Sequence, residues 1–232
     1  VFIVAIPLLW NVYDKQSLLA KFKLITTNWK QITIGFIGLA VFPLIQIMYW
    51  KAVTGEFIFN TYQDTPGFDW LEPHLQKVFF SYKKGWLLYT PMIAFCILGL
   101  ISLFRKNKKI AFSVFAFFIV NVYVISAWGT WWQGGSFGSR YFVESYAILA
   151  LPLGYFIKDV WSKKWLKFLF IPIASFFVFL NLFQIWQFNN WIFDGYSMTK
   201  EYYWKIFLKT SVSEDDKKYR EIIRDFGPVD TF

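Results

Sequence analysis

Residues 110–127 read IAFSVFAFFIVNVYVISA, a run of 18 residues that contains no charged side chain. An α-helix rises about 1.5 Å per residue, and the hydrocarbon core of a bilayer is about 30 Å thick, so a span takes roughly 17 to 25 apolar residues. The length and composition of this run therefore predict a membrane-spanning helix.

Similar apolar runs occur on both sides of this segment. Four more have the required length, at residues 31–50, 87–104, 141–157 and 168–188. The run from Val1 to Trp10 is also apolar, but it has no initiating Met and no charged region of a signal peptide. We expect it to be the tail of a span, and the chain to be the C-terminal part of a longer protein. The sequence thus predicts an all-α polytopic membrane helix bundle with five complete spans and a truncated first one.

The composition agrees with a membrane protein. Of the 232 residues, 56% are hydrophobic and 24% aromatic, but only 17% are charged. Soluble domains average about 25% charged residues. This aromatic content also exceeds what one globular core can bury, so much of the surface must face something other than water.

The formal net charge of +9 comes from three loops. Residues 11–30, 105–109 and 158–167 together hold 12 basic and 2 acidic residues. The positive-inside rule predicts that these loops are cytoplasmic and that the C-terminus lies outside. The charge is then a signal of topology, and nucleic acid is not the expected partner.

The outer side should carry the longer elements. These are the loops 51–86 and 128–140, within a membrane domain of residues 1–190, and a C-terminal tail of residues 191–232. Within the first loop, Leu75, Val78, Phe79 and Tyr82 follow the i, i+3, i+4, i+7 pattern of an amphipathic helix. We expect this helix to lie in the outer interface, where tryptophans such as Trp191 form an aromatic belt.

The loop after residue 127 is the most informative candidate for chemistry. Its notable residues are Trp131, Trp132, Gly134, Gly135, Arg140 and Tyr141. Glycines let the backbone approach a ligand, and a helix start offers free N–H groups to an anion. An arginine adds a planar set of donors that suits phosphate. The alternative is a tight turn with a snorkelling arginine and belt tryptophans.

Glu144 and two lysines extend this candidate site. Glu144 lies four residues after Arg140 within an apolar segment, where a charge is costly and usually functional; a structural ion pair of the two is the alternative. Lys83 and Lys84 lie on the outer side, where the topology rule disfavours them. We interpret them as ligands of an anionic partner, either a polyprenyl phosphate or membrane lipid headgroups in general.

Other kinds of site find little support. No pair of Cys or His has the spacing of metal ligands, no glycine-rich loop of a nucleotide site follows a strand, and His74 is the single histidine. We therefore predict neither a metal nor a cofactor.

Two motifs resemble a known family. The sequence KGWLLYTP, residues 84–91, enters a predicted span, and WWQGGSFGSRY follows forty residues later at 131–141. Together they resemble the C-terminal half of bacterial integral-membrane glycosyltransferases of the GT-C class, over roughly residues 31–190. The closest groups use polyprenyl-phosphate sugars and are related to protein mannosyltransferases and to the aminoarabinose transferase of lipid A.

The resemblance implies an inverting glycosyltransferase in the bacterial cytoplasmic membrane. Its donor substrate would be a polyprenyl-phosphate sugar on the periplasmic side, and its acceptor a lipid, a glycan or a protein. By motif, Lys84, Arg140 and the turn of Gly134 and Gly135 correspond to the donor phosphate site, with Glu144 in support. The catalytic carboxylate of the family would lie upstream of Val1. The catalytic residue here is therefore unknown, and the chain is expected to need the missing N-terminal part of the protein.

A non-catalytic membrane subunit, a flippase or a transporter is the alternative from another class. Transporters typically carry broken helices with polar residues near the middle of the membrane. In this sequence the polar features gather at the outer surface instead, which weighs against transport but not against a scaffold.

Overall fold

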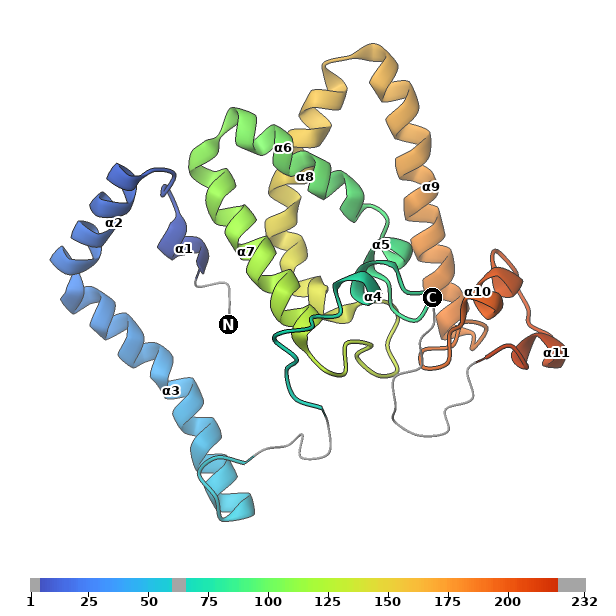
Figure 1. The fold of residues 1–232 in the computed structure, drawn as a ribbon, viewed down its shortest axis with the longest axis horizontal. Coiled ribbons are helices and arrows are strands. Elements are labelled where there is room, and N and C mark those ends of the chain that lie inside the picture. The colour runs from blue at the N-terminus through green and yellow to red at the C-terminus, as the bar shows by residue number, and fades with distance from the viewer. Residues whose placement is uncertain (1–4, 60–65, 221–232) are drawn as a thin grey trace.

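The computed structural model describes residues 5–59 and 66–220, and this part of the chain is helical (Figure 1). Its only β feature is an isolated antiparallel bridge between Phe68 and Trp128. The helices are α1 Ala5–Leu9, α2 Lys15–Thr27, α3 Trp29–Thr54, α4 Leu75–Phe80, α5 Trp86–Tyr89, α6 Ile93–Lys106, α7 Lys108–Ala127, η2 Arg140–Ser145, α8 Tyr146–Trp161, α9 Lys164–Asn189, α10 Lys200–Ile206 and α11 Glu214–Lys217.

Three of the described helices, α3, α7 and α9, are long and apolar enough to cross a membrane. They contain the predicted spans 31–50, 110–127 and 168–188, and they indicate a membrane protein. Individual residues determine where two of these helices begin or end. The Asn107 side chain accepts a hydrogen bond from the Ile110 N–H at the start of α7 (3.3 Å), and α3 ends at Gly55, whose φ of 81° is left-handed.

The predicted tail of a first span can be followed only in part. Val1, at which this tail begins in the sequence, and residues 2–4 lie outside the described residues. The part that the structure describes is α1, a helix of five residues that contacts α7. A truncated first span, and a catalytic carboxylate upstream of Val1, therefore stay predictions.

The other two predicted spans differ from the structure. One continuous helix over residues 87–104 is wrong: α5 ends at Tyr89, and α6 begins only at Ile93 and is 14 residues long. Pro91 causes the break, because proline lacks an N–H and disfavours the helical region for the residue before it; Thr90 has φ −136° and ψ 65°. The run 141–157 begins in the 3₁₀ helix η2 and continues as the 16-residue α8.

The predicted amphipathic helix that includes Leu75, Val78 and Phe79 is present but short, and its place in the membrane interface stays a prediction. It forms as α4, which has six residues and ends before Tyr82. Val78 is fully buried and Phe79 packs against the same cluster, whereas Leu75 and Phe80 are exposed. The pattern at Val78 and Phe79 therefore marks a face that packs on the protein, and α4 contacts α5 and α7.

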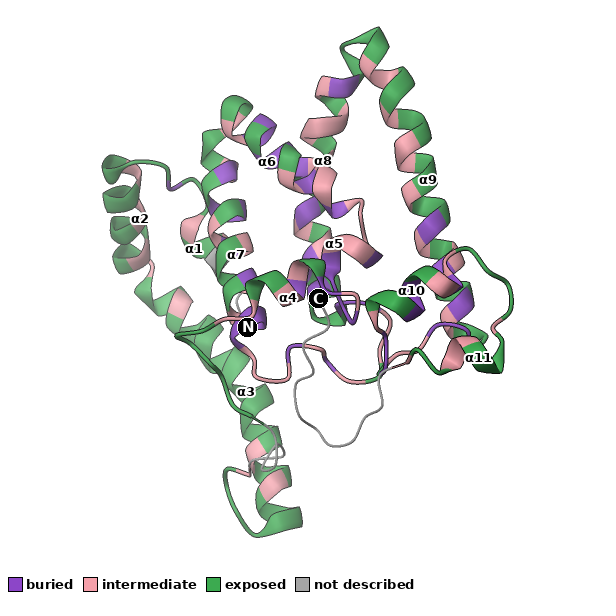
Figure 2. Cartoon of the chain, turned by 45° about the vertical axis from the view of Figure 1, so that its right-hand side comes forward, coloured by how far each residue is buried: buried purple, intermediate pink, exposed green. Residues whose placement is uncertain are grey.

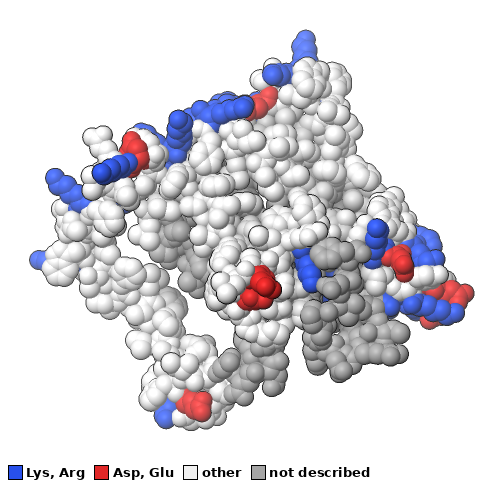
Figure 3. Space-filling model, viewed as in Figure 1, with Lys and Arg blue, Asp and Glu red and all other residues white. Residues whose placement is uncertain are grey.

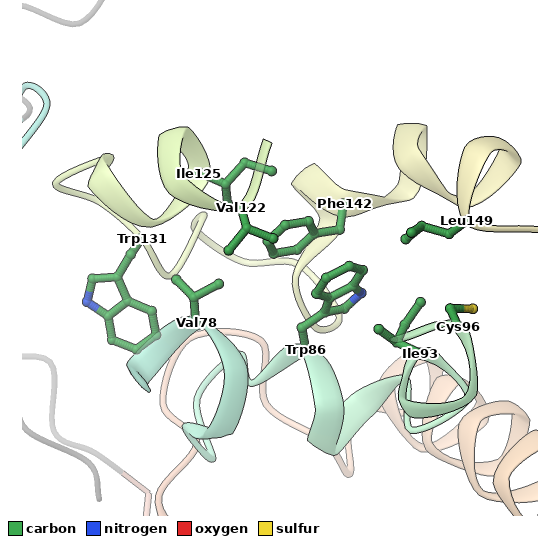
Figure 4. Close-up of a cluster of buried hydrophobic side chains, with 9 residues drawn as sticks. All are labelled: Val78, Trp86, Ile93, Cys96, Val122, Ile125, Trp131, Phe142 and Leu149. Carbon is green, nitrogen blue, oxygen red and sulfur yellow. The ribbon is translucent and has the colours of Figure 1, made fainter. Parts of the chain in front are cut away.

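One buried cluster joins the short helices α4, α5 and η2 to the longer ones (Figure 4). At its centre the Trp86 ring of α5 stacks on the Phe142 ring of η2, with ring centroids 3.8 Å apart and planes 7° apart. The other members of the cluster are Val78, Ile93, Cys96, Val122, Ile125, Trp131 and Leu149. Isolated helices of four to six residues are unstable in water, so this packing is what holds α4, α5 and η2 in place.

Burial is unevenly distributed among the long helices (Figure 2). No residue of α3 is buried, and its apolar side chains are exposed along its whole length. In contrast, α6 packs along α8, and Gly99 lies directly against the backbone of Pro152. A Cβ at Gly99 would overlap the Pro152 carbonyl, so the close approach of these helices requires glycine.

We predict that Gly99→Ala destabilises the protein by about 1–3 kcal/mol, because the added methyl group can fit only if the α8 backbone moves. Gly154→Ala in α8 is the matched control. Nothing lies within 4 Å of a Cβ built there, and alanine favours a helix more than glycine does. Unfolding of both variants in detergent checks the prediction, and equal stability of the two variants would contradict it.

Candidate functional site

Three segments meet at the end of the structure that lies away from the α6–α7 and α8–α9 turns (Figure 1). They are the turn 81–85, the glycine-containing loop 131–140 and the loop 191–197 after α9. We call the side chains of Lys83, Lys84 and Arg140 on these segments the cation cluster.

Hydrogen bonds of Lys84 connect the three segments. Its side chain is 1% exposed, and its Nζ donates hydrogen bonds to the carbonyl oxygens of Ser136 and Gly195, the latter at 2.6 Å. The Lys84 carbonyl in turn accepts a hydrogen bond from the Ser139 hydroxyl at 3.0 Å. The predicted neighbourhood of Lys84 and the glycine-containing loop is therefore present, and Gly195 adds the tail to it.

The glycine-containing loop has a conformation that few residue types adopt. Gly134 and Gly138 have φ of 67° and 55°, in the left-handed region, as does Gln133 with 59°. At Gly135 a Cβ would overlap the Tyr196 ring, so this position requires glycine for space. Glycines here serve both the turn and a close contact with the tail.

Gln133 stabilises this loop, and sequence reasoning did not select it. It is buried, and its Oε1 accepts a hydrogen bond from the Tyr141 N–H at 3.0 Å. Its Nε2 lies 3.5 Å from the Ser139 hydroxyl. A glutamine between two tryptophans and two glycines gives no sequence signal of this role, because the bond depends on a positive φ.

The two tryptophans of the loop have different environments. Trp131 is buried in the central cluster, and its Nε1 has no hydrogen-bond partner. Trp132 is partly exposed, and the Lys83 Nζ lies 5.4 Å from the centroid of its ring, within the range of a cation–π contact. Of the two rings, Trp132 is thus the one that a ligand at the cation cluster can reach.

Arg140 and Glu144 do not form the ion pair that their spacing suggested. Both are exposed, and among the described ion pairs none joins them. The physical reason is the 3₁₀ geometry of η2, in which three residues complete a turn, so residues i and i+4 point about 120° apart. The Arg140 guanidinium lies instead near the Tyr141 ring, 5.7 Å from its centroid.

An open hollow of about 890 Å³ lies beside these residues. Arg140, Tyr141 and Glu144 line it together with Asn121 of α7. The Asn121 amide donates to the Ser145 hydroxyl at 3.1 Å, which links α7 to η2 at the floor of the hollow. Donors, a carboxylate and an aromatic ring therefore face one concave surface, a typical composition for a small-molecule site.

The electrostatics of the cation cluster follow from its burial. The pKa of Lys84 falls from 10.5 to about 7, first because burial disfavours the charged form and then because Lys83 and Arg140 repel it. Asp194 acts in the opposite direction. Lys83 and Arg140 therefore disfavour the charged form of Lys84, and an added anion would favour it.

Comparison of the chain with protein-family models, curated proteins and solved structures gives no match. Within residues 5–59 and 66–220, no three His, Cys, Asp or Glu side chains are placed to hold a metal ion. The cation cluster and its surroundings are therefore the candidate functional site.

We predict that Lys84 makes stability depend on pH. Between about pH 7 and 10.5 the unfolded chain keeps the Lys84 proton and the folded chain does not, so the free energy of unfolding rises with pH in this interval. Lys84→Met should remove this rise. Thermal unfolding in detergent at pH 7 and 9 measures it, with Lys23→Met at an exposed site of α2 as control. A rise of the same size in the wild type and Lys84→Met would contradict the prediction.

Proposed function

We propose that the chain is part of a membrane glycosyltransferase that moves a sugar from a polyprenyl-phosphate donor to an acceptor on the outer side of the membrane. The observation that carries the proposal is the cation cluster, in which Lys83 and Arg140 disfavour the charged form of the buried Lys84 beside a loop of unusual backbone conformation. The resemblance of residues 84–91 and 131–141 to GT-C enzymes agrees with this interpretation.

A phosphate group suits the cation cluster for two reasons. Its negative charge offsets the repulsion within the cluster and restores the proton on Lys84. Arg140 is exposed and presents a planar set of donors that matches phosphate oxygens. Trp132 lies on the same loop, and Lys83 lies on the neighbouring turn 81–85. Lys84, whose ammonium is directed at two carbonyl groups, positions the loop and contributes its charge.

The distribution of charge supports an outer position of the site. Lys and Arg side chains gather along the edge formed by α2 and by the α6–α7 and α8–α9 turns (Figure 3). The cation cluster belongs to the opposite end of the helices. With the basic edge in the cytoplasm, as the positive-inside rule requires, α6 and η2–α8 complete five spans in the cytoplasmic membrane of a bacterium and the C-terminus lies outside.

In the proposed reaction the donor phosphate lies at the cation cluster and the sugar in the hollow beside Glu144. An acceptor oxygen forms a bond to the anomeric carbon as the bond from that carbon to the phosphate oxygen breaks. The polyprenyl phosphate leaves with the bonding electrons, and Lys83 and Arg140 stabilise its developing charge. The acceptor proton passes to a carboxylate that the resemblance places upstream of Val1.

We expect Arg140→Ala and Lys83→Ala each to weaken donor binding about tenfold or more, since each removes a charge-assisted contact to phosphate. Binding of a radiolabelled polyprenyl-phosphate hexose to the protein in nanodiscs measures this effect. Lys200→Ala, at an exposed site of α10, is the control. Wild-type affinity should also increase from pH 8 to pH 6, because Lys84 gains its proton while the phosphodiester stays ionised. Unchanged affinity in both variants would refute the proposal.

A further inference from the structure

A second hollow, of about 460 Å³, lies on the other side of the glycine-containing loop. Trp191, Asp194, Tyr196 and Arg220 line it together with Gly135. Its volume lies in the range of about 300–1,000 Å³ that is usual for small-molecule sites. The Gly195 carbonyl next to it accepts the hydrogen bond from Lys84, so the hollow and the cation cluster share one framework.

Trp191 is the most unusual residue of this hollow. Its side chain is 85% exposed, and its φ of 59° is left-handed. Such a conformation costs about 1–3 kcal/mol for a residue other than glycine and persists only where its surroundings impose it. Here the Trp191 N–H donates to the Phe188 carbonyl at 3.2 Å, and the Trp191 carbonyl accepts from Arg220 at 3.4 Å. The Trp191 ring is thus exposed on the surface, while hydrogen bonds hold the backbone that carries it.

The polar groups around the ring are also held in place. Asp194 Oδ1 accepts the N–H groups of Tyr196 and Ser197, both at 2.8 Å, and Oδ2 lies 3.3 Å from Arg220 Nη1. Arg220 Nη2 donates to the Tyr202 hydroxyl at 2.9 Å, whereas its Nε is buried without a partner. A carboxylate and a guanidinium therefore stand beside an exposed ring with little freedom to move.

Each charged side chain that lines this hollow has an ion-pair partner of opposite sign. Asp194 pairs with Arg220, and Lys217, which also lines the hollow, pairs with Glu214. A phosphate or another anion would have to compete with Asp194 and Glu214 for these cations. A neutral hexose suits this hollow better. The C–H face of a pyranose ring packs on an aromatic ring, and its hydroxyl groups both donate and accept hydrogen bonds.

We propose that the hollow lined by Trp191, Asp194 and Arg220 binds a neutral hexose unit. The assignment of this hexose to the acceptor of the reaction rests on the proposed transferase function, whereas the hexose site itself does not. The same chemistry occurs in a soluble glycan and in a glycolipid headgroup, and the experiment separates these two sources.

Saturation-transfer NMR of the detergent-solubilised chain with methyl α-D-glucopyranoside, methyl α-D-mannopyranoside and methyl α-D-galactopyranoside tests the site. We expect a saturable signal from at least one hexoside. Trp191→Ala should weaken it about tenfold or more, a loss of roughly 1.4 kcal/mol, while Trp191→Phe keeps a ring and part of the affinity. Trp165→Ala is the matched control, because Trp165 is likewise exposed but lies near the other end of α9.

No saturable signal with any of the three hexosides, or equal affinity in Trp191→Ala and the wild type, would overturn the proposal. Since Trp191 is exposed, loss of its ring should leave folding intact, which an unchanged thermal midpoint verifies. Hexoside binding that survives in Arg140→Ala establishes the site even if the polyprenyl-phosphate donor does not bind. Tighter binding of a hexosyl diacylglycerol in nanodiscs than of the methyl hexoside assigns the site to a glycolipid, and equal binding assigns it to a soluble glycan.

Discussion

The candidate functional site depends on one buried amino group. Lys84 Nζ donates to the carbonyl groups of Ser136 and Gly195, and so connects a turn, the glycine-containing loop and the segment after α9. Burying a lysine is unfavourable, and the lowered pKa shows how its cost is reduced: a neutral amine still has two hydrogens for two carbonyl oxygens. The same arrangement makes the site sensitive to charge, because any anion that restores the proton changes the strength of the bonds that hold the loops.

Much of the fold could be predicted from the sequence. Long apolar runs became α3, α7 and α9, and the helices α3 and α9 continue through Pro43 and Pro172. The prediction failed where one residue changed the local geometry. Pro91 divides the run 87–104 into α5 and α6, and the 3₁₀ turn at Arg140 directs Glu144 away from the arginine. Hydropathy averages over such positions and cannot detect them.

The candidate site, like the fold, could be predicted from the sequence only in part. The glycines and the two motifs singled out the glycine-containing loop, and Lys84 contacts it. The partners that complete the site were not predictable, because they come from distant parts of the chain or depend on backbone angles. Gly195 lies 111 residues after Lys84, and Gln133 reaches the Tyr141 N–H only through a left-handed φ. A motif identifies which residues are unusual, whereas the packing decides which of them meet.

Two aromatic residues explain why Lys84 and Arg140 belong to one cluster. Lys84 lies two residues before Trp86, and Arg140 lies two residues before Phe142. The rings of Trp86 and Phe142 stack with their centroids 3.8 Å apart, so the two segments are fixed side by side and Arg140 acts on the charge of Lys84. Burial of two large rings supplies the free energy for this, since each aromatic side chain buries roughly 150–250 Å². The high aromatic content is therefore more than a membrane signature, because part of it forms the core that brings like charges together.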